Sequence, residues 1–449
     1  MVLNSSQFIV QHKDDDVRTL ALKKMPEGVD AKWALQQIEG YQLAKKKLPT
    51  WATAFETSTC GVESEGGIIF PPRISMEQCS SELTAKYKAQ LFPIVNCKSS
   101  NCKFLDLTGG FGVDFSYMAQ GFRHAVYVEQ NEELCSIAQH NFPLLGLPHA
   151  QVINTTCEQF LSTLSLQSPT PPITPPFTPS FTPLTIFLDP ARRDTHGRKV
   201  VTIEDCTPNL LELQDRLLHI ADHIIIKLSP MLDITDALRK LHNVAEVHVV
   251  SVHGECKELL FIIDNSESII HNSPDVTVHC VNLDTDDEPF ITTLRNNLQS
   301  SILFASSSSF AVNLQSPTYL YEPNASIMKA GVQDAFGMKY GLQKLAPNSN
   351  LFVSSESISH IPARRFRIVG ITDFNKTNLR NFLKDIRQAN LTVRNFPSDV
   401  ASLRKRLKLK EGGTDYLFAT TLHDGTHALL RCVKEWHPET EAKQQVKIN

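Results

Sequence analysis

The chain has 449 residues, a formal net charge of −4 and ten cysteines. This length exceeds what one hydrophobic core usually organises, so two or three domains are expected, and the slightly acidic balance excludes a chain that binds nucleic acid over its whole surface. The cysteines lack paired C-x-x-C spacing, so we expect neither a metal site nor a disulfide framework. No signal peptide, transmembrane run or lipid anchor is visible, which predicts a cytoplasmic protein without membrane contact.

Residues 1–100 have the pattern of a mainly helical N-terminal region. A basic stretch with a tryptophan occupies residues 45–51. Residues 80–88 follow with serines at the position of a helix N-cap. This helix is expected to lead into the first strand of the next domain.

The loop after that first strand is the most specific feature of the sequence. Residues 104–114, FLDLTGGFGVD, read as a short apolar strand, a turn containing Thr108, Gly109, Gly110 and Gly112, and the start of a helix. The next apolar run ends at Glu129. Glycines let the backbone approach a ligand and a carboxylate accepts ribose hydroxyls, so the pattern is typical of a site for an adenosine-containing cofactor.

The glycine spacing and Asp106 indicate which cofactor. Gly110 and Gly112 match the first two glycines of the dinucleotide pattern G-x-G-x-x-G, but Phe115 stands at the third position, where its ring would impede close helix–strand packing. Asp106 would repel a pyrophosphate, yet it suits the ammonium of a methionine moiety. No Gly-Lys-Ser/Thr completes a Walker loop. These residues predict S-adenosylmethionine; the alternative is a glycine turn in an ordinary βα unit.

The segments that follow alternate between helices and strands. Asn131 is placed to cap a helix, and residues 151–154, 185–190 and 224–228 read as further strands. The runs 247–251 and 259–263 have only a short turn between them, so they must pair antiparallel. This layout predicts an α/β fold with a class I methyltransferase Rossmann-like sheet, parallel with an antiparallel terminal hairpin, and smaller α+β domains after it.

The predicted site lies beyond the carboxyl ends of the strands, where open α/β sheets bind their ligands, so Asp106, Glu129, Thr156, Asp189 and Lys227 are expected to lie there together. Thr156 and Cys157 follow the third strand, where the adenine ring would lie. The predicted cofactor-binding residues are Asp106, Thr108, Gly109, Gly110, Gly112, Glu129, Gln130, Thr156 and Cys157.

The fourth strand ends in Asp189-Pro190-Ala191-Arg192, beside the expected methyl group. This resembles the strand-four motif of amino- and RNA methyltransferases, in which Asp or Asn followed by Pro offers oxygen acceptors to the target nitrogen. Asp189, Pro190 and Arg192 are therefore the predicted catalytic residues, with Arg192 stacking on a base or binding phosphate. Ala191 and Arg192 stand where that motif usually has a second proline and an aromatic residue, so the target atom stays open. The alternative is a solvated loop in which Arg192 pairs with nearby acids.

A proline-rich insertion at residues 168–183 interrupts this domain, whose expected limits are 101–265. Proline cannot join a strand ladder, so the insertion is expected to be a surface excursion before the fourth strand.

The C-terminal part carries the strongest positive cluster. Arg364 and Arg365 lie in an expected strand, and Ser398 is placed to cap a basic helix that ends at Gly412 and Gly413. A basic helix beside a basic strand predicts a surface that tracks phosphates, and the alternative is a solvated helix face. The predicted RNA-binding residues are Arg364, Arg365, Arg404, Lys405, Arg406 and Lys408.

With these residues in view, the chain resembles the bacterial THUMP-like-domain methyltransferases over nearly its full length. The resemblance is carried by residues 78–82, 106–114, 127–131, 189–194, 227–233, 393–397 and 403–407. It implies a ferredoxin-like segment, placed at 266–330, followed by a THUMP-like domain at 331–435. THUMP domains accompany RNA-modifying enzymes elsewhere, so the resemblance favours RNA as the partner.

The sequence thus predicts an S-adenosylmethionine-dependent methyltransferase acting on a tRNA or rRNA base. One alternative keeps the methyltransferase with a small-molecule or protein substrate. Another is a non-catalytic RNA-binding protein with a vestigial Rossmann domain. The methylated atom, the RNA species and the oligomeric state are left open by the sequence.

Overall fold

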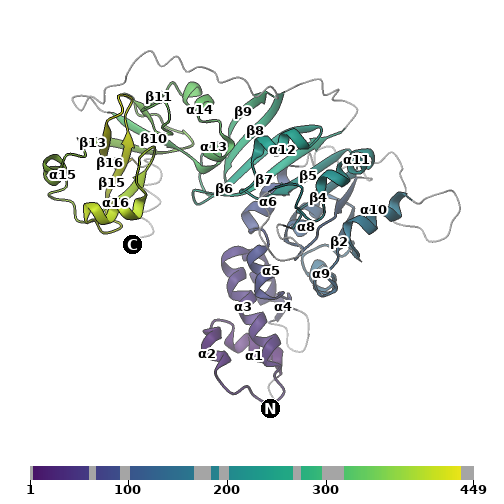
Figure 1. Cartoon of the computed structure of the whole chain (residues 1–449). Helices are drawn as coiled ribbons and strands as arrows, with labels where there is room; N and C mark the ends of the chain where they lie inside the picture. The colour runs from purple at the N-terminus through teal and green to yellow at the C-terminus, as the bar shows by residue number, and fades with distance from the viewer. Residues whose placement is uncertain are drawn as a thin grey trace. The chain divides into compact units, whose positions relative to one another are not determined.

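The computed structural model describes residues 4–59, 67–91, 102–165, 184–191, 202–265, 275–295 and 318–435 (Figure 1). The chain divides into two compact units, Met1–Ala245 with Leu259–Asn272, and Glu246–Glu258 with Ser273–Asn449. The proline-rich insertion and Arg192 lie outside the described residues.

The first unit begins with helices whose ends are set by side-chain caps. Asn4, Asp16 and Asp30 each accept a backbone N–H in the first turn of the helix that follows. Ser81 caps the last of these helices by accepting from the Thr84 N–H, so the helix predicted near residues 80–88 is confirmed. The helices are α1 (Ser5–His12), α2 (Val17–Ala21), α3 (Ala31–Lys47), α4 (Pro49–Thr59), α5 (Arg73–Gln78) and α6 (Glu82–Gln90).

The first sheet has the strand order β3-β2-β1-β4-β5-β7-β6-β8-β9. Its parallel strands are β1 (Lys103–Asp106), β2 (His124–Glu129), β3 (Gln151–Asn154), β4 (Leu184–Leu188) and β5 (His223–Leu228). β7 (Glu255–Asp264) runs antiparallel to β5 and forms a hairpin with β6 (Val244–Val252). His253 and Gly254 both have positive φ, as the tight primed hairpin turns require. The class I methyltransferase sheet predicted from the sequence is confirmed.

Two further strands extend this sheet beyond the hairpin. β8 (Asp275–Asn282) pairs parallel with β6, and β9 (Phe290–Arg295) pairs antiparallel with β8. The sequence analysis assigned these residues to the ferredoxin-like segment, whereas they hydrogen-bond to the methyltransferase sheet. The sequence could not show this, because an alternating strand pattern does not identify its partner.

Crossover helices connect the parallel strands. α9 is capped by Asn131, which accepts from the Leu134 N–H as predicted. Phe115, the residue in place of a third glycine, is fully buried and packs its ring against Phe104, Tyr127 and Phe142. The helices of this layer are α8 (Val113–Met118), the 3-10 turn η1 (Ala119–Gly121), α9 (Glu132–Leu144), α10 (Cys157–Ser165), α11 (Leu210–Ile220) and α12 (Ile234–Lys240).

The second sheet has the order β11-β12-β10-β13-β16-β15-β14. Alternate residues of its central strands serve two cores: Phe418 and Leu430 pack on one face, while Leu417 and Leu429 pack on the other. Its elements are β10 (Tyr319–Pro323), α13 (Ala325–Ala330), α14 (Gln333–Lys339), β11 (Gln343–Lys344), β12 (Phe352–Ser354), β13 (Ala363–Asp373), α15 (Lys376–Phe382), β14 (Asn390–Val393), α16 (Val400–Leu407), β15 (Asp415–Thr421) and β16 (His427–Lys434).

The limits of the basic helix α16 differ from the prediction. Asp399, not Ser398, is its N-cap, because the Asp399 carboxylate accepts from the Ser402 N–H three residues on. The helix ends before Lys408, which adopts the left-handed conformation of a C-cap, so the glycine pair predicted as its end lies in the following loop. No helix within the described ranges is long and apolar enough to cross a membrane.

Candidate active site

The glycine loop after β1 is packed too closely for side chains. A Cβ on Gly109 would lie 2.1 Å from the Tyr127 ring, and one on Gly112 would lie 2.9 Å from the Phe142 ring. Gly110 and Gly112 also have positive φ, and Gly112 forms the N-cap of α8. The loop thus packs against the aromatic core beneath it. Packing excludes a side chain at Gly109, the backbone conformation favours glycine at Gly110, and both conditions apply at Gly112.

Asp106 ends β1 as a buried carboxyl group. Its side chain is 1% exposed and its Oδ1 accepts from the Thr108 N–H at 2.9 Å. Burial, together with the negative charges of Asp114, Asp189 and Glu129, raises the pKa of Asp106 well above its usual range. A carboxyl group in this setting gains greatly from a cationic ligand, because a positive charge would offset both effects.

Glu129 lies at the end of β2, and each of its carboxylate oxygens accepts a backbone N–H. Oε2 accepts from the Gly110 N–H and Oε1 from the Asn131 N–H, each at 2.8 Å. Each carboxylate oxygen has a second lone pair, so the group can still accept hydroxyl hydrogens. Gln130 beside it is exposed, and its carbonyl accepts from the Asn154 side chain.

The residues after β3 form the N-terminus of helix α10. Thr156 accepts from the Gln159 N–H through its hydroxyl, at the N-terminus of α10. Cys157 is buried, and burial raises the pKa of its thiol to about 12. It therefore offers an apolar wall rather than a reactive thiolate.

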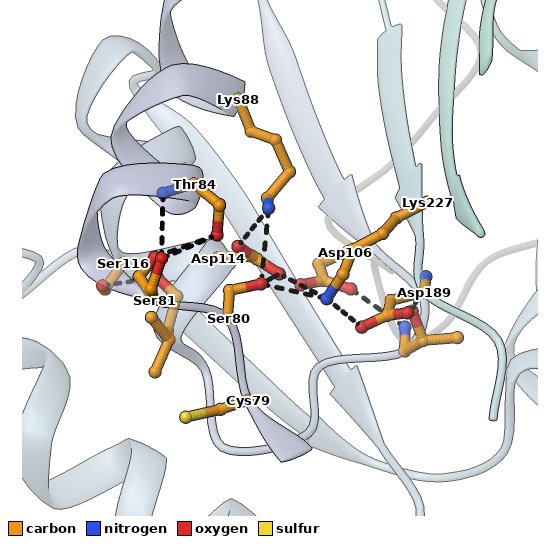
Figure 2. A network of polar contacts seen from close by, with 12 residues as sticks. Cys79, Ser80, Ser81, Thr84, Lys88, Asp106, Asp114, Ser116, Asp189 and Lys227 are labelled. Atoms are coloured by element: carbon orange, nitrogen blue, oxygen red, sulfur yellow. Dashed lines mark hydrogen bonds and ion pairs between the residues drawn. The ribbon is translucent and has the colours of Figure 1, made fainter. Parts of the chain in front are cut away.

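A buried ion network joins the strand-four carboxylate to the helices (Figure 2). Lys227, on β5, contacts Asp189 Oδ2 at 2.5 Å, Asp114 Oδ2 at 3.3 Å and Ser80 Oγ at 2.9 Å. Lys88, on α6, reaches Asp114 Oδ1 at 3.1 Å, and the Ser80 hydroxyl donates to Asp114 Oδ2 at 2.7 Å. Lys88 is fully buried and Asp189 is the most exposed member, with 31% of its side chain accessible.

Lys227 lies at the sheet edge where the sequence analysis expects it, whereas Ser80, Lys88 and Asp114 were not predicted as members of this network. Burial alone would raise the pKa of Asp114, but the charges of Lys88 and Lys227 and the Ser80 hydrogen bond outweigh it and lower the pKa to about 2. Lys227 therefore lies between two carboxylates and holds one oxygen of Asp189. The sequence offered a signal for Lys227, which follows three consecutive isoleucines near the end of β5.

Contacts on either side of Asp189 in the chain fix its position at the end of β4. The Asp189 N–H donates to the Thr108 hydroxyl at 2.6 Å, which ties the end of β4 to the glycine loop. Pro190 is buried, and Ala191 forms an antiparallel bridge with Thr207. Asp106, Thr108, Asp189 and Lys227 are thus brought to one edge of the sheet. The predicted role of Arg192 stays a prediction.

Comparison with solved structures places the chain among known proteins. It is 31% identical to the crystal structure described as a "putative methyltransferase from Porphyromonas gingivalis W83", with a TM-score of 0.75 and coverage of 97% of this chain and 98% of that one. The chain belongs to the family of that protein. The family models agree at the C-terminus, where a ferredoxin-like domain matches residues 319–362 and a THUMP domain-like model matches residues 363–434. The comparison with curated proteins found no match.

Two other solved structures match only part of this chain. An rRNA methylase from Streptococcus thermophilus is 11% identical, with a TM-score of 0.27 and coverage of 40% of this chain and 93% of its own. An O-methyltransferase from Bacillus cereus in complex with SAH is 11% identical, with a TM-score of 0.30 and coverage of 51% and 98%. TM-scores this low support no argument about substrate.

The two C-terminal family segments share one sheet. β10 of the ferredoxin-like segment pairs antiparallel with β13 of the THUMP-like segment. The matched segments meet at residues 362 and 363, whereas the sequence analysis placed the boundary at 330. The domain limits drawn from the sequence stay a prediction.

The basic residues of the THUMP-like domain divide into two groups. Arg364 forms an ion pair with the buried Glu322, and Arg365 donates to the Ile358 carbonyl. Arg404 donates to the carbonyls of Ala389 and Lys410. These three guanidinium groups hold the domain's own backbone and carboxylates.

The other three predicted RNA-binding residues are exposed. Lys405, Arg406 and Lys408 lie at the C-terminal end of α16, with Arg406 also placed 5.6 Å from the centre of the Phe374 ring. The structure therefore leaves a smaller cationic surface than the sequence suggested, made of these three side chains.

Proposed function

We propose that this protein is an S-adenosylmethionine-dependent methyltransferase that modifies an RNA base in tRNA or rRNA. The observation that carries the cofactor assignment is Asp106, a buried carboxyl group whose pKa is raised by burial and by neighbouring carboxylates, beside a glycine loop. The cofactor's ammonium would supply the compensating charge. The chain also shares its family with a protein described as a "putative methyltransferase", which supports the same assignment.

The remaining residues at this edge fit the other parts of the cofactor. Glu129 would accept the ribose hydroxyls with its free lone pairs, Gln130 would flank them, and Thr156 and Cys157 would contact the adenine. Gly109 and Gly110 would allow the close approach. When bound, S-adenosylmethionine supplies a methyl group activated by a sulfonium.

Asp189 is the residue proposed to orient the target. Lys227 occupies its Oδ2, and the Thr108 hydroxyl fixes its backbone, so Oδ1 is left to accept an N–H of the substrate. Accepting that hydrogen would direct the nitrogen lone pair toward the methyl group, a contribution from proximity and orientation. Lys227 is then a positioning residue for Asp189.

RNA is proposed as the substrate because the THUMP-like domain presents Lys405, Arg406 and Lys408 to solvent. Three cations on one short helix end suit phosphate contacts, which are independent of sequence and sensitive to salt. A small-molecule or protein substrate is the alternative, and a non-catalytic RNA-binding protein is a second. The cytoplasmic location expected from the sequence stays a prediction.

Calorimetric titration with S-adenosylmethionine tests the cofactor assignment. Protein stripped of copurified cofactor should bind it, and Asp106→Asn should weaken binding by ~10- to 100-fold, because the ammonium would lose its negatively charged partner. Asp215→Asn, at a carboxylate that is 90% exposed, is the matched control and should bind normally. Absence of binding by the wild-type protein would refute the proposal.

Transfer of labelled methyl to fractionated cellular RNA separates the substrates. Labelled tRNA or rRNA supports the proposal. Label in protein or in small molecules favours the first alternative, and cofactor-independent RNA binding without transfer favours the second.

A further inference from the structure

A cluster of two histidines and a glutamate lies on the strands that extend the first sheet. Glu246 and His248 are two residues apart on β6, so their side chains point to the same face. β8 runs parallel to β6, and His279 is the register partner of His248. All three residues belong to the same compact unit.

The potential ligand atoms of this cluster converge. The Nε2 atoms of His248 and His279 lie 2.9 Å and 3.2 Å from the same Glu246 oxygen, Oε2, and all three atoms lie within 4.8 Å of one another. The ligand atoms of a tetrahedral zinc ion are about 3.3 Å apart. The two distances to Glu246 Oε2 are therefore close to those between the ligand atoms of a zinc ion.

One nitrogen of the cluster is left without a directed hydrogen bond. His279 Nε2 is buried and has no hydrogen-bond partner among the described residues, although Glu246 Oε2 is close. Buried polar atoms in native proteins nearly always have a partner. This atom faces the carboxylate oxygen, so a ligand between the three side chains would satisfy it.

The cluster is also charged and accessible in the way a cation needs. The neighbouring histidines, His248 first, lower the pKa of Glu246 well below its usual range, and burial lowers the pKa of His248. The Glu246 side chain is 43% exposed, which leaves a path from solvent.

We propose that Glu246, His248 and His279 form a binding site for one Zn²⁺ ion, coordinated by Oε and the two Nε2 atoms with water completing the tetrahedron. The site would join β6 to β8, the strand pair that attaches β8 and β9 to the sheet. The imidazole rings of His248 and His279 are stacked, with their centroids 4.2 Å apart and an interplanar angle of 4°. Both rings must therefore rotate out of the stack to aim their lone pairs at one ion.

Zinc binding to the full-length protein tests this site. Protein treated with a chelator and desalted is titrated with Zn²⁺ in competition with a chromophoric chelator, and its melting temperature is recorded with and without the ion. The wild-type protein should bind one ion per chain and melt at a higher temperature when it is bound. Co²⁺ in the site should show visible bands without thiolate charge transfer, because no cysteine is a ligand.

The variants Glu246→Gln and His279→Gln remove one ligand each at the more exposed positions of the cluster. Each should lower zinc affinity at least about tenfold and remove the thermal shift. His253→Gln is the matched control, because His253 forms an exposed pair with Asp284 at 2.9 Å and should leave binding unchanged. Circular dichroism in zinc-free buffer verifies that the variants fold.

Two results would overturn the proposal. One is a wild-type protein that binds no Zn²⁺ in the competition assay. The other is zinc bound equally by the wild-type protein, Glu246→Gln and His279→Gln, which would assign the ion to cysteines elsewhere.

Discussion

Replacing Asp114 by asparagine tests the physical account of the buried ion network. The carboxylate contacts Lys88 and Lys227, which are 0% and 7% exposed, so both cations would remain buried with one counter-charge fewer. Asp114→Asn should therefore destabilise the fold strongly at neutral pH.

The size of the effect follows from the pKa of Asp114. A shift from 3.8 to about 2, at ~1.4 kcal/mol per pKa unit, corresponds to about 2 kcal/mol of folding stability. Removing one partner of a buried ion pair typically costs ~3–5 kcal/mol. We expect Asp114→Asn to lower the free energy of unfolding at pH 7 by between about 2 and 5 kcal/mol.

The pH dependence has a definite sign. The folded-state pKa of Asp114 is depressed, so its contribution is fully present above pH 4 and is lost as the pH falls toward 2. The stability difference between the wild-type protein and Asp114→Asn should thus be constant from pH 7 to about pH 5. It should shrink as the pH falls below about 4, because the Asp114 carboxylate of the unfolded chain protonates there while that of the folded protein stays ionised until the pH approaches 2.

Urea unfolding followed by tryptophan fluorescence measures this difference. Trp51 is buried, and the centroid of its ring lies 4.8 Å from that of Phe111, three residues before Asp114. Its fluorescence therefore reports on the compact unit that contains Asp114. Asp236→Asn is the control, because Asp236 is 41% exposed in its pair with Lys240, and it should change stability by less than ~0.5 kcal/mol. A loss below 1 kcal/mol for Asp114→Asn, or a loss that does not vary between pH 7 and pH 3, would refute the reasoning.

The other predictions concern the proposed function. Affinity for S-adenosylmethionine, measured by calorimetry, should rise with pH through the raised pKa of Asp106, because the ammonium favours the ionised carboxylate, and Asp106→Asn should abolish this dependence. Glu129→Gln should weaken cofactor binding by ~1–3 kcal/mol in the same assay; unchanged affinity would mean that Glu129 does not hold the ribose. Asp189→Ala and Lys227→Met should lower turnover in a methyl-transfer assay with little change in cofactor affinity, and a large loss of affinity instead would remove Asp189 from the catalytic role. Lys405→Glu should weaken RNA binding and flatten its salt dependence in filter-binding assays, and an unchanged salt slope would argue against the cationic surface.

The sequence revealed those parts of the site that are local in the chain. Asp106, the glycines and Glu129 lie at strand ends within a short segment, so the loop geometry followed from residue types. The hairpin of β6 and β7 was predictable because its turn is too short for a helix.

Features built from distant segments escaped the sequence analysis. The ion network joins Lys227 to Ser80, Lys88 and Asp114, and these contacts exist only because α6 packs beside α8 near the end of β5. Glu246 and His279 are likewise neighbours only through the register of β6 and β8. Sequence spacing also could not separate Arg364, which pairs with Glu322, from the exposed Lys405, because both read simply as basic residues.

The most direct test of the central claim is mass spectrometry of nucleosides from the cellular RNA of wild-type and deletion strains. We predict that deletion removes one methylated nucleoside from tRNA or rRNA, and that the wild-type gene restores it while the Asp189→Ala gene does not. An identical set of methylated nucleosides in both strains would contradict an RNA methyltransferase. Restoration by Asp189→Ala would contradict the assignment of the strand-four carboxylate.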